Sequence, residues 1–207
     1  MSNRINRKYR KWPKWLIYLP IVTFMIVGLL FLYSSNEPRL FYDWSGIRQS
    51  VKDTVINIAD HGGVTAAIVG FDTVTPQQYH RRTWLIKNTT LNELTILRNY
   101  PNGAVKAMAY EGLIRRDSTH RFEILMRALQ DTTTFFNFQE GCLGEWTMLS
   151  EYLVDRVLQL HIDITYPPPP PPDGYIHSFS DEEMNEIKNR YRELVKKNQE
   201  YLQAYLE

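Results

Sequence analysis

The feature that most constrains this chain is an apolar stretch of 19 residues, Trp15–Tyr33. The stretch has no charged residue, and Thr23 is its only clearly polar member. At about 1.5 Å per residue, a helix of this length spans roughly 28 Å, close to the thickness of the hydrocarbon core of a bilayer. We therefore expect residues 15–33 to form a single transmembrane helix that anchors the chain in a membrane.

The charges on the two sides of this stretch have opposite signs. Residues 1–14 contain six Lys or Arg and no acid, whereas the chain from Glu37 onward contains 18 bases and all 23 acids, a net charge of −5. Basic residues beside a transmembrane helix remain on the cytoplasmic side. This predicts a cytoplasmic tail over 1–14, an anchor in the cell (inner) membrane, and a periplasmic or otherwise extracytoplasmic C-terminal part.

A cleaved signal peptide and a buried core helix are the alternatives for residues 15–33. A signal peptide has a shorter apolar run that ends in small residues, and Leu32–Ser35 is a poor cleavage context. A core helix with so few polar residues is rare in a protein of 207 residues. The single cysteine, Cys142, excludes an intrachain disulfide and with it a disulfide-stapled secreted fold.

Helical periodicity dominates the expected exported domain, residues 37–165. Apolar residues recur at steps of three and four over 40–60, which predicts a helix. Thr75–Pro76 predicts the start of a second helix, which continues to about Lys87. The apolar run over 64–71 fits either a helix or a strand.

Residues 91–113 predict two helices joined by a tight turn. The Leu-rich segment 91–97 precedes Pro101–Asn102, and the segment after this turn has small residues that permit close packing. A similar pattern returns about 30 residues later, with an apolar helix over 122–129, a turn, an apolar segment that includes Phe135 and Phe136, and a last helix over 145–160. Recurrence of helix pairs at this spacing indicates a stacked α-helical repeat.

The first of these helix pairs resembles the HEAT repeat. Val105 and Lys106 occupy the places of the Val-Arg pair that opens the second helix of that repeat, and Ala109 and Gly112 occupy the places of its small residues. The resemblance covers roughly residues 75–160 and extends to a group of uncharacterised bacterial membrane-anchored or lipoprotein-like proteins. It implies an all-α fold of stacked helical hairpins that acts as a binding scaffold without catalytic residues.

A proline-rich linker, 166–174, separates this domain from an amphipathic helix expected over 180–206. Six consecutive prolines adopt a stiff polyproline II rod, here interpreted as a spacer or as a ligand for an aromatic groove. Ser180 and Glu183 form a capping box at the start of the helix. The helix has a heptad-like seam, made of Met184, Ile187, Tyr191, Leu194, Asn198, Tyr201 and Tyr205. The seam either packs on the body of the chain or forms a homodimeric coiled coil through residues 184–205.

No motif for nucleophilic catalysis, phosphate binding or metal binding is present, so we predict no enzyme activity and no cofactor. The five histidines are scattered, and His161 with Asp163 is interpreted as a polar edge rather than a metal site. The basic cluster of Arg115, Arg116, Arg121 and Arg127 is either a solvated face or a docking patch for an acidic partner. The candidate interaction residues are Arg115, Arg116, Arg121, Ile187, Tyr191, Leu194, Asn198 and Tyr201.

These observations predict a membrane-anchored, non-catalytic protein-interaction module of the cell envelope, with an unidentified protein partner. Nucleic acid is excluded by the net negative charge of the exported part. The first alternative is an immunity-type protein that binds and neutralises a toxin. The second is a hydrolase with an unrecognised site, which would require a pocket that brings His80 or His120 to a carboxylate.

Overall fold

The computed structural model of the chain describes residues 18–35, 42–70, 75–162 and 179–206. The chain divides into two compact units, Met1–Tyr42 and Asp43–Glu207. The expected tail over 1–14 and the proline linker over 166–174 lie outside the described residues.

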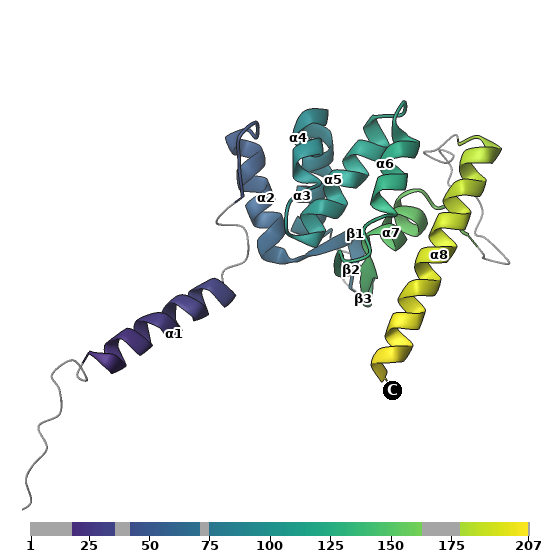
Figure 1. The fold of residues 1–207 in the computed structure, drawn as a ribbon. Helices are drawn as coiled ribbons and strands as arrows, with labels where there is room; N and C mark the ends of the chain where they lie inside the picture. The colour runs from purple at the N-terminus through teal and green to yellow at the C-terminus, as the bar shows by residue number, and fades with distance from the viewer. Residues whose placement is uncertain (1–17, 36–41, 71–74, 163–178, 207) are drawn as a thin grey trace, which may run out of the picture. The chain divides into compact units, whose positions relative to one another are not determined.

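In the first unit the structure describes one helix, α1 (Leu19–Ser35), drawn in purple in Figure 1. Its first residue is Leu19, so that Pro20 lies in the first turn, the part of a helix that tolerates proline. Its 17 residues span about 26 Å, against about 30 Å for a hydrocarbon core. Among the described residues no helix combines the length and apolarity needed to cross a bilayer. This finding corrects the prediction of a transmembrane anchor over 15–33, and the cellular location of the chain stays a prediction.

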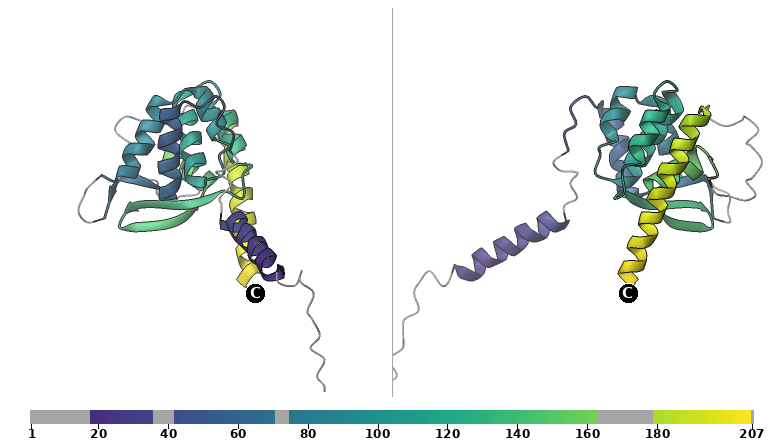
Figure 2. Two further views of the ribbon diagram at one scale, coloured as in Figure 1. Left: turned by 90° about the vertical axis from the view of Figure 1, so that its left-hand side faces the viewer. Right: turned by 45° about the vertical axis from the view of Figure 1, so that its right-hand side comes forward.

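The second unit combines helices with a small sheet. Figure 1 shows helices α2 to α6 gathered on one side of the three strands, and Figure 2 shows the same arrangement from two further directions. The elements are α2 (Gln49–His61), β1 (Gly63–Val69), α3 (Gln77–Asn88), α4 (Leu91–Leu97), α5 (Gly103–Arg116), α6 (Arg121–Ala128), β2 (Phe135–Gly141), β3 (Leu143–Met148), α7 (Leu149–Glu151), the π-helical turn η3 (Tyr152–Val157) and α8 (Asp181–Leu206).

The three strands form one mixed sheet in the order β1-β2-β3. β1 pairs in parallel with β2, with Gly63 opposite Asn137. β2 and β3 form an antiparallel hairpin in which Glu140 pairs with Leu143. The sheet corrects the all-α prediction, and the stack of HEAT-like hairpins is wrong as a fold class.

The physical reason lies in the period of the apolar residues in the supposed second repeat. Phe136 and Phe138 are buried, whereas Phe135 and Asn137 between and beside them are exposed. This alternation has the period of a strand with one buried face. The helix predicted over 145–160 is confirmed only in its middle part, because residues 145–148 belong to β3, residues 149–157 form α7 and η3, and residues 158–160 follow η3.

Other local predictions are confirmed or sharpened. The undecided run over 64–71 is a strand as far as Val69. The helix predicted over 75–87 is α3, and the predicted helix over 40–60 begins only at Gln49. The helical hairpin of α4 and α5 is confirmed, and the Asn102 side chain caps α5 by accepting from the backbone N–H groups of residues 104 and 105.

α5 is the central element of the second unit. It packs against α2, α3, α4, α6, η3, β1 and β2, and most of its side chains are buried. Gly112 permits the close contact with α4, because a Cβ atom there would lie 2.9 Å from Cδ1 of Leu94. The predicted role of this small residue is confirmed.

The C-terminal helix α8 starts as predicted. The Glu183 carboxylate accepts from the backbone N–H of Ser180 at 2.8 Å, and the Ser180 hydroxyl accepts from the backbone N–H of Glu183 at 3.2 Å. These two hydrogen bonds complete the capping box.

Candidate functional site

A buried cluster of charged residues joins α3, α5 and η3. Glu111 on α5 is 1% exposed. Arg82 holds both oxygens of its carboxylate, since Nε donates to Oε2 at 2.7 Å and Nη2 donates to Oε1 at 2.6 Å. The Nε of Arg115 and the hydroxyl of Tyr152 each donate to the same carboxylate at 2.7 Å. We refer to these four residues as the Glu111 cluster.

The Glu111 cluster is fixed in one ionisation state. Burial acts to raise the pKa of Glu111, but the two arginines and the Tyr152 hydroxyl outweigh it and hold the pKa below its ordinary value. Burial and the charge of Glu111 raise the pKa of Tyr152 well above its ordinary value. The cluster therefore holds η3 against α5 and has no proton to exchange near neutral pH.

An open groove of about 530 Å³ lies beside η3, between the strand β3 and the helix α8. We refer to it as the β3–α8 groove, and it is lined by Glu145, Trp146, Thr147, Glu151, Asp155, Arg156, His161 and Tyr191. A neighbouring hollow of about 360 Å³ shares three of these residues and also contacts Arg82 and Tyr152. The groove therefore adjoins the Glu111 cluster.

The backbone beside the groove is unusual in two ways. η3 is a π-helical turn of six residues, and Gln159 and His161 just after it have φ angles of +54° and +49°. Non-glycine residues rarely adopt this left-handed conformation. π-helical turns and such strained residues both concentrate at functional sites, so the backbone favours a functional role for this part of the surface.

Arg156 organises the carboxylates on the strand side of the groove. Its Nη1 donates to Glu140 at 3.1 Å and its Nη2 donates to Glu145 at 2.9 Å. The guanidinium also lies over the ring of Phe138, 5.4 Å from its centroid. Arg156 is thus oriented by two strands while its side chain stays partly exposed.

Asp155, one residue earlier on η3, connects the groove to α8. Its Oδ2 accepts a hydrogen bond from the Tyr191 hydroxyl at 2.9 Å. Burial raises the pKa of Asp155 despite this hydrogen bond and the positive charge of Arg156. The cations that surround Asp155 therefore do not fully compensate the burial of its charge.

The strand β3 presents large apolar side chains to solvent. Leu143 is 79% exposed and Trp146 is 74% exposed. β3 is also an edge strand, because within the sheet it pairs with β2 alone. An exposed edge with apolar side chains is a surface on which other chains readily pair.

A smaller hollow of about 250 Å³ contains one of the histidines named for the hydrolase alternative. His120 Nδ1 lies 3.0 Å from Oδ1 of Asp117, which also accepts the backbone N–H of His120. The pair therefore closes the turn between α5 and α6. Thr95 lines the same hollow, but its hydroxyl donates to the carbonyl of Leu91, so it is not held as a nucleophile.

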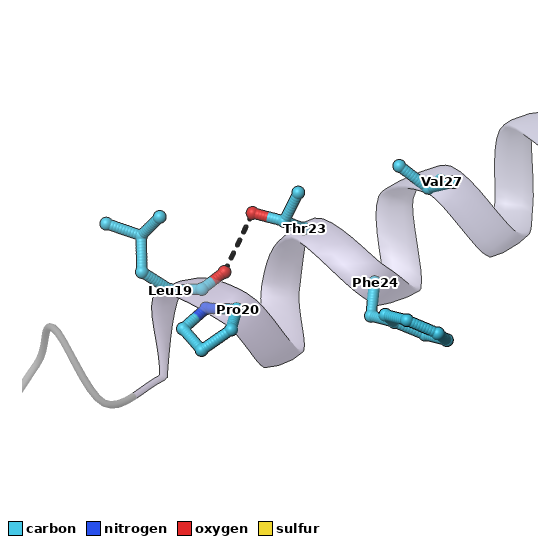
Figure 3. A pocket seen from close by; sticks show the side chains of 5 residues that line it. All are labelled: Leu19, Pro20, Thr23, Phe24 and Val27. Atoms are coloured by element: carbon cyan, nitrogen blue, oxygen red, sulfur yellow. Dashed lines mark hydrogen bonds between the residues drawn. The ribbon is translucent and has the colours of Figure 1, made fainter.

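A further hollow lies along α1 in the first unit, lined by Leu19, Pro20, Thr23, Phe24 and Val27. Figure 3 shows that these side chains belong to one helix and that Phe24 and Val27 point in different directions. The Thr23 hydroxyl donates to the carbonyl of Leu19 within that helix. The hollow is an open helix surface and brings no polar groups together.

No family model matches the chain, and no curated protein or solved structure is detectably similar to it. The resemblance to HEAT repeats therefore has no support from these comparisons. Among the described residues, no group of three or more His, Cys, Asp or Glu is arranged to hold a metal ion.

The three arginines predicted as a docking patch are engaged within the chain. Arg115 pairs with Glu111. Arg116 donates to the backbone carbonyls of Ile86 and Thr89 at the end of α3. Arg121 is buried and donates to the carbonyl of Ile114 at the end of α5. Arginines in these places stabilise helix C-termini, and the docking role stays a prediction.

The residues predicted along α8 fall into two groups. Ile187, Tyr191 and Leu194 are buried, which favours the interpretation that the seam packs within the chain. Asn198 is half-buried, and Tyr201 belongs to the part of α8 whose side chains are not described. The homodimer through residues 184–205 stays a prediction.

Sequence reasoning found Tyr191 but missed the rest of the β3–α8 groove. Trp146, Asp155 and Arg156 lie in the segment predicted as one regular helix over 145–160, and in such a helix they would not surround a groove with a strand on one side. Gly141–Cys142, between two apolar runs, was the available indication of a hairpin.

Proposed function

We propose that this chain is a non-catalytic protein-interaction module that binds a partner polypeptide at the β3–α8 groove. The observation that carries the proposal is the exposed edge strand β3, with Leu143 and Trp146 in solvent, beside a groove lined by charged side chains. Aromatic residues are enriched at protein interfaces, and Trp146 lines the groove. An immunity-type protein that binds a toxin is one class of such a module.

Two further features support a binding role over catalysis. Arg156 is engaged by Glu140 and Glu145, and Asp155 is engaged by Tyr191. The groove is also open along an edge strand, a shape that suits a polypeptide.

Site-specific photo-crosslinking tests the proposal. A benzophenone amino acid is placed at Trp146 in cells that express the chain, and the matched control carries it at the exposed Asn92 on α4. We expect a discrete crosslinked protein from position 146 that is absent from position 92. Equal crosslinking from the two positions, or none from position 146, contradicts the proposal.

A further inference from the structure

The direction of the backbone groups along β3 is the first step of a more specific inference. The N–H of Met148 donates to Oε2 of Glu151 at 3.1 Å, so it points away from β2. In an antiparallel strand the N–H and C=O groups of every second residue point to the same side. Trp146 and Gly144 therefore also direct their backbone groups away from β2. No described residue hydrogen-bonds these two N–H groups.

The second step is the position of the groove relative to this edge. β3 contributes three successive residues to its lining, and α8 contributes Tyr191. A strand rises about 3.3 Å per residue, so the edge from Gly144 to Trp146 matches a short extended segment. Addition of a strand to a sheet edge is a common mode of peptide recognition.

The third step is the charge of the groove. Glu145, Glu151 and Asp155 line it together with a single arginine, Arg156, whose guanidinium already binds Glu140 and Glu145. The Glu151 carboxylate accepts from the backbone N–H of Met148 and from the Thr147 hydroxyl, and no described residue forms an ion pair with it. Oδ1 of Asp155 has no hydrogen-bond partner among the described residues. The groove is therefore complementary to a positive charge.

We propose that the β3–α8 groove binds an extended segment of a partner protein that pairs with the free edge of β3 and places a lysine or arginine side chain against Asp155 and Glu151. This inference rests on the proposed function and specifies the chemistry of its partner. The backbone of the segment supplies hydrogen bonds to Gly144 and Trp146, and its cation neutralises the carboxylates. Charge complementarity of this kind contributes mainly specificity and association rate.

Selection from a random linear heptapeptide library on the full chain provides the probe. We expect the selected peptides to be enriched in lysine or arginine flanked by β-branched residues. Absence of binders, or enrichment of acidic peptides, overturns the inference.

The charge contact is tested with the synthetic form of the best selected peptide. Asp155→Asn removes the charge, but its side-chain oxygen can still accept the hydrogen bond from Tyr191, and it is expected to weaken binding by about tenfold. Glu186→Gln changes an exposed carboxylate elsewhere on α8 and is expected to have no effect. Unchanged binding by Asp155→Asn, or an equal loss in Asp155→Asn and Glu186→Gln, would overturn the inference.

The strand contact is tested by amide hydrogen exchange in the folded full chain. The peptide is expected to slow exchange at the amides of Gly144 and Trp146. Trp146→Pro removes one of these donors on the side away from β2, and Trp146→Ala is its control for the loss of the indole. We expect Trp146→Pro to bind more weakly than Trp146→Ala. Unchanged exchange at both amides overturns the inference even where Trp146→Pro fails to fold.

The two proposals fail in different ways. If crosslinking from Trp146 gives no specific adduct, the proposed function fails. If a specific adduct forms but the selected peptides are not cationic or do not protect the edge amides, the interaction module stands and the cationic strand is wrong.

Discussion

Two networks of charged side chains in this chain use the same chemistry in different surroundings. In the Glu111 cluster, one carboxylate that is 1% exposed accepts from two arginines and a tyrosine. In the β3–α8 groove, one arginine whose side chain is 44% exposed binds two carboxylates that are more exposed still. The difference in burial gives the two networks different roles.

A buried ion pair loses hydration on both partners, so removal of one partner leaves an uncompensated charge in the interior. An exposed pair exchanges its contacts with water at little cost. The Glu111 cluster therefore stabilises the arrangement of α3, α5 and η3, whereas the network of Arg156 is free to rearrange around a ligand. This comparison can be tested by breaking each network in turn.

The largest effect is expected from Glu111→Gln. The substitution leaves Arg82 and Arg115 without their carboxylate, and we expect it to lower the free energy of unfolding by about 3 kcal/mol. Urea denaturation near neutral pH measures the loss. Its counterpart in the network of Arg156, Glu140→Gln, is expected to cost no more than about 0.5 kcal/mol. Similar costs for the two variants would contradict the comparison.

An intermediate case is Glu93 on α4, which is nearly buried but binds the exposed Arg48. Hydrogen bonds from Arg48 and from the backbone, opposed by burial, lower the pKa of Glu93 to about 2. An acid with a lowered pKa in the folded state stabilises the fold above its unfolded pKa, and this contribution is lost as the pH falls from about 4.5 to 2.

We expect Glu93→Gln to reduce the free energy of unfolding at neutral pH by about 1–2 kcal/mol, and to make it depend less on pH over that acid range. Urea midpoints of the variant and the parent chain across the acid range measure both effects. Parallel pH profiles for the two proteins would show that Glu93 does not carry this dependence.

Arg156→Ala should have a small effect on folding and a clear effect on binding. Its partners Glu140 and Glu145 are exposed, so we expect a loss of less than about 1 kcal/mol in urea denaturation. Removal of the cation from the groove is expected to strengthen binding of the selected cationic peptide by about threefold. Fluorescence anisotropy with the labelled peptide measures this change, and weaker binding would mean that Arg156 itself contacts the ligand.

The smallest effect is expected from Asp155→Asn in the absence of ligand. Burial raises the pKa of Asp155, so the folded state binds a proton more tightly than the unfolded state. The free energy of unfolding therefore decreases as the pH rises from the pKa of this carboxyl in the unfolded chain through its higher pKa in the folded chain. The variant should therefore be slightly more stable than the parent near neutral pH, by less than about 1 kcal/mol, and equal to it in acid. A loss of stability near neutral pH would indicate that the ionised carboxylate is needed for packing against Tyr191.

Local sequence patterns predicted the parts of the fold that depend on local interactions. The capping box of Ser180 and Glu183 and the turn at Asn102 involve contacts within a few residues, and both predictions are confirmed. The strand β2 was missed because the adjacent Phe135 and Phe136 conceal an alternating pattern. Its partner β1 is far away in the sequence, so no local pattern indicates their pairing.

The candidate site was harder to predict for the same reason. Arg156 contacts Glu140 and Glu145 only because β2 and β3 form a hairpin that folds back over η3. The π-helical geometry of η3 has no clear signature in its sequence. By contrast, the basic cluster was conspicuous in the sequence, and two of its members, Arg116 and Arg121, bind carbonyls at helix ends.

The parallel pairing of β1 with β2 has a consequence for folding during synthesis. Gly63 pairs with Asn137, so β1 leaves the ribosome about 70 residues before its partner, a delay of several seconds at about 5–20 residues per second. During this time α3 is already available, and the Gln78 side chain donates to the carbonyl of Gly63 at 2.6 Å. We expect β1 to dock first on the helices and to receive β2 last, so that the edge strand β3 is completed only at the end of folding.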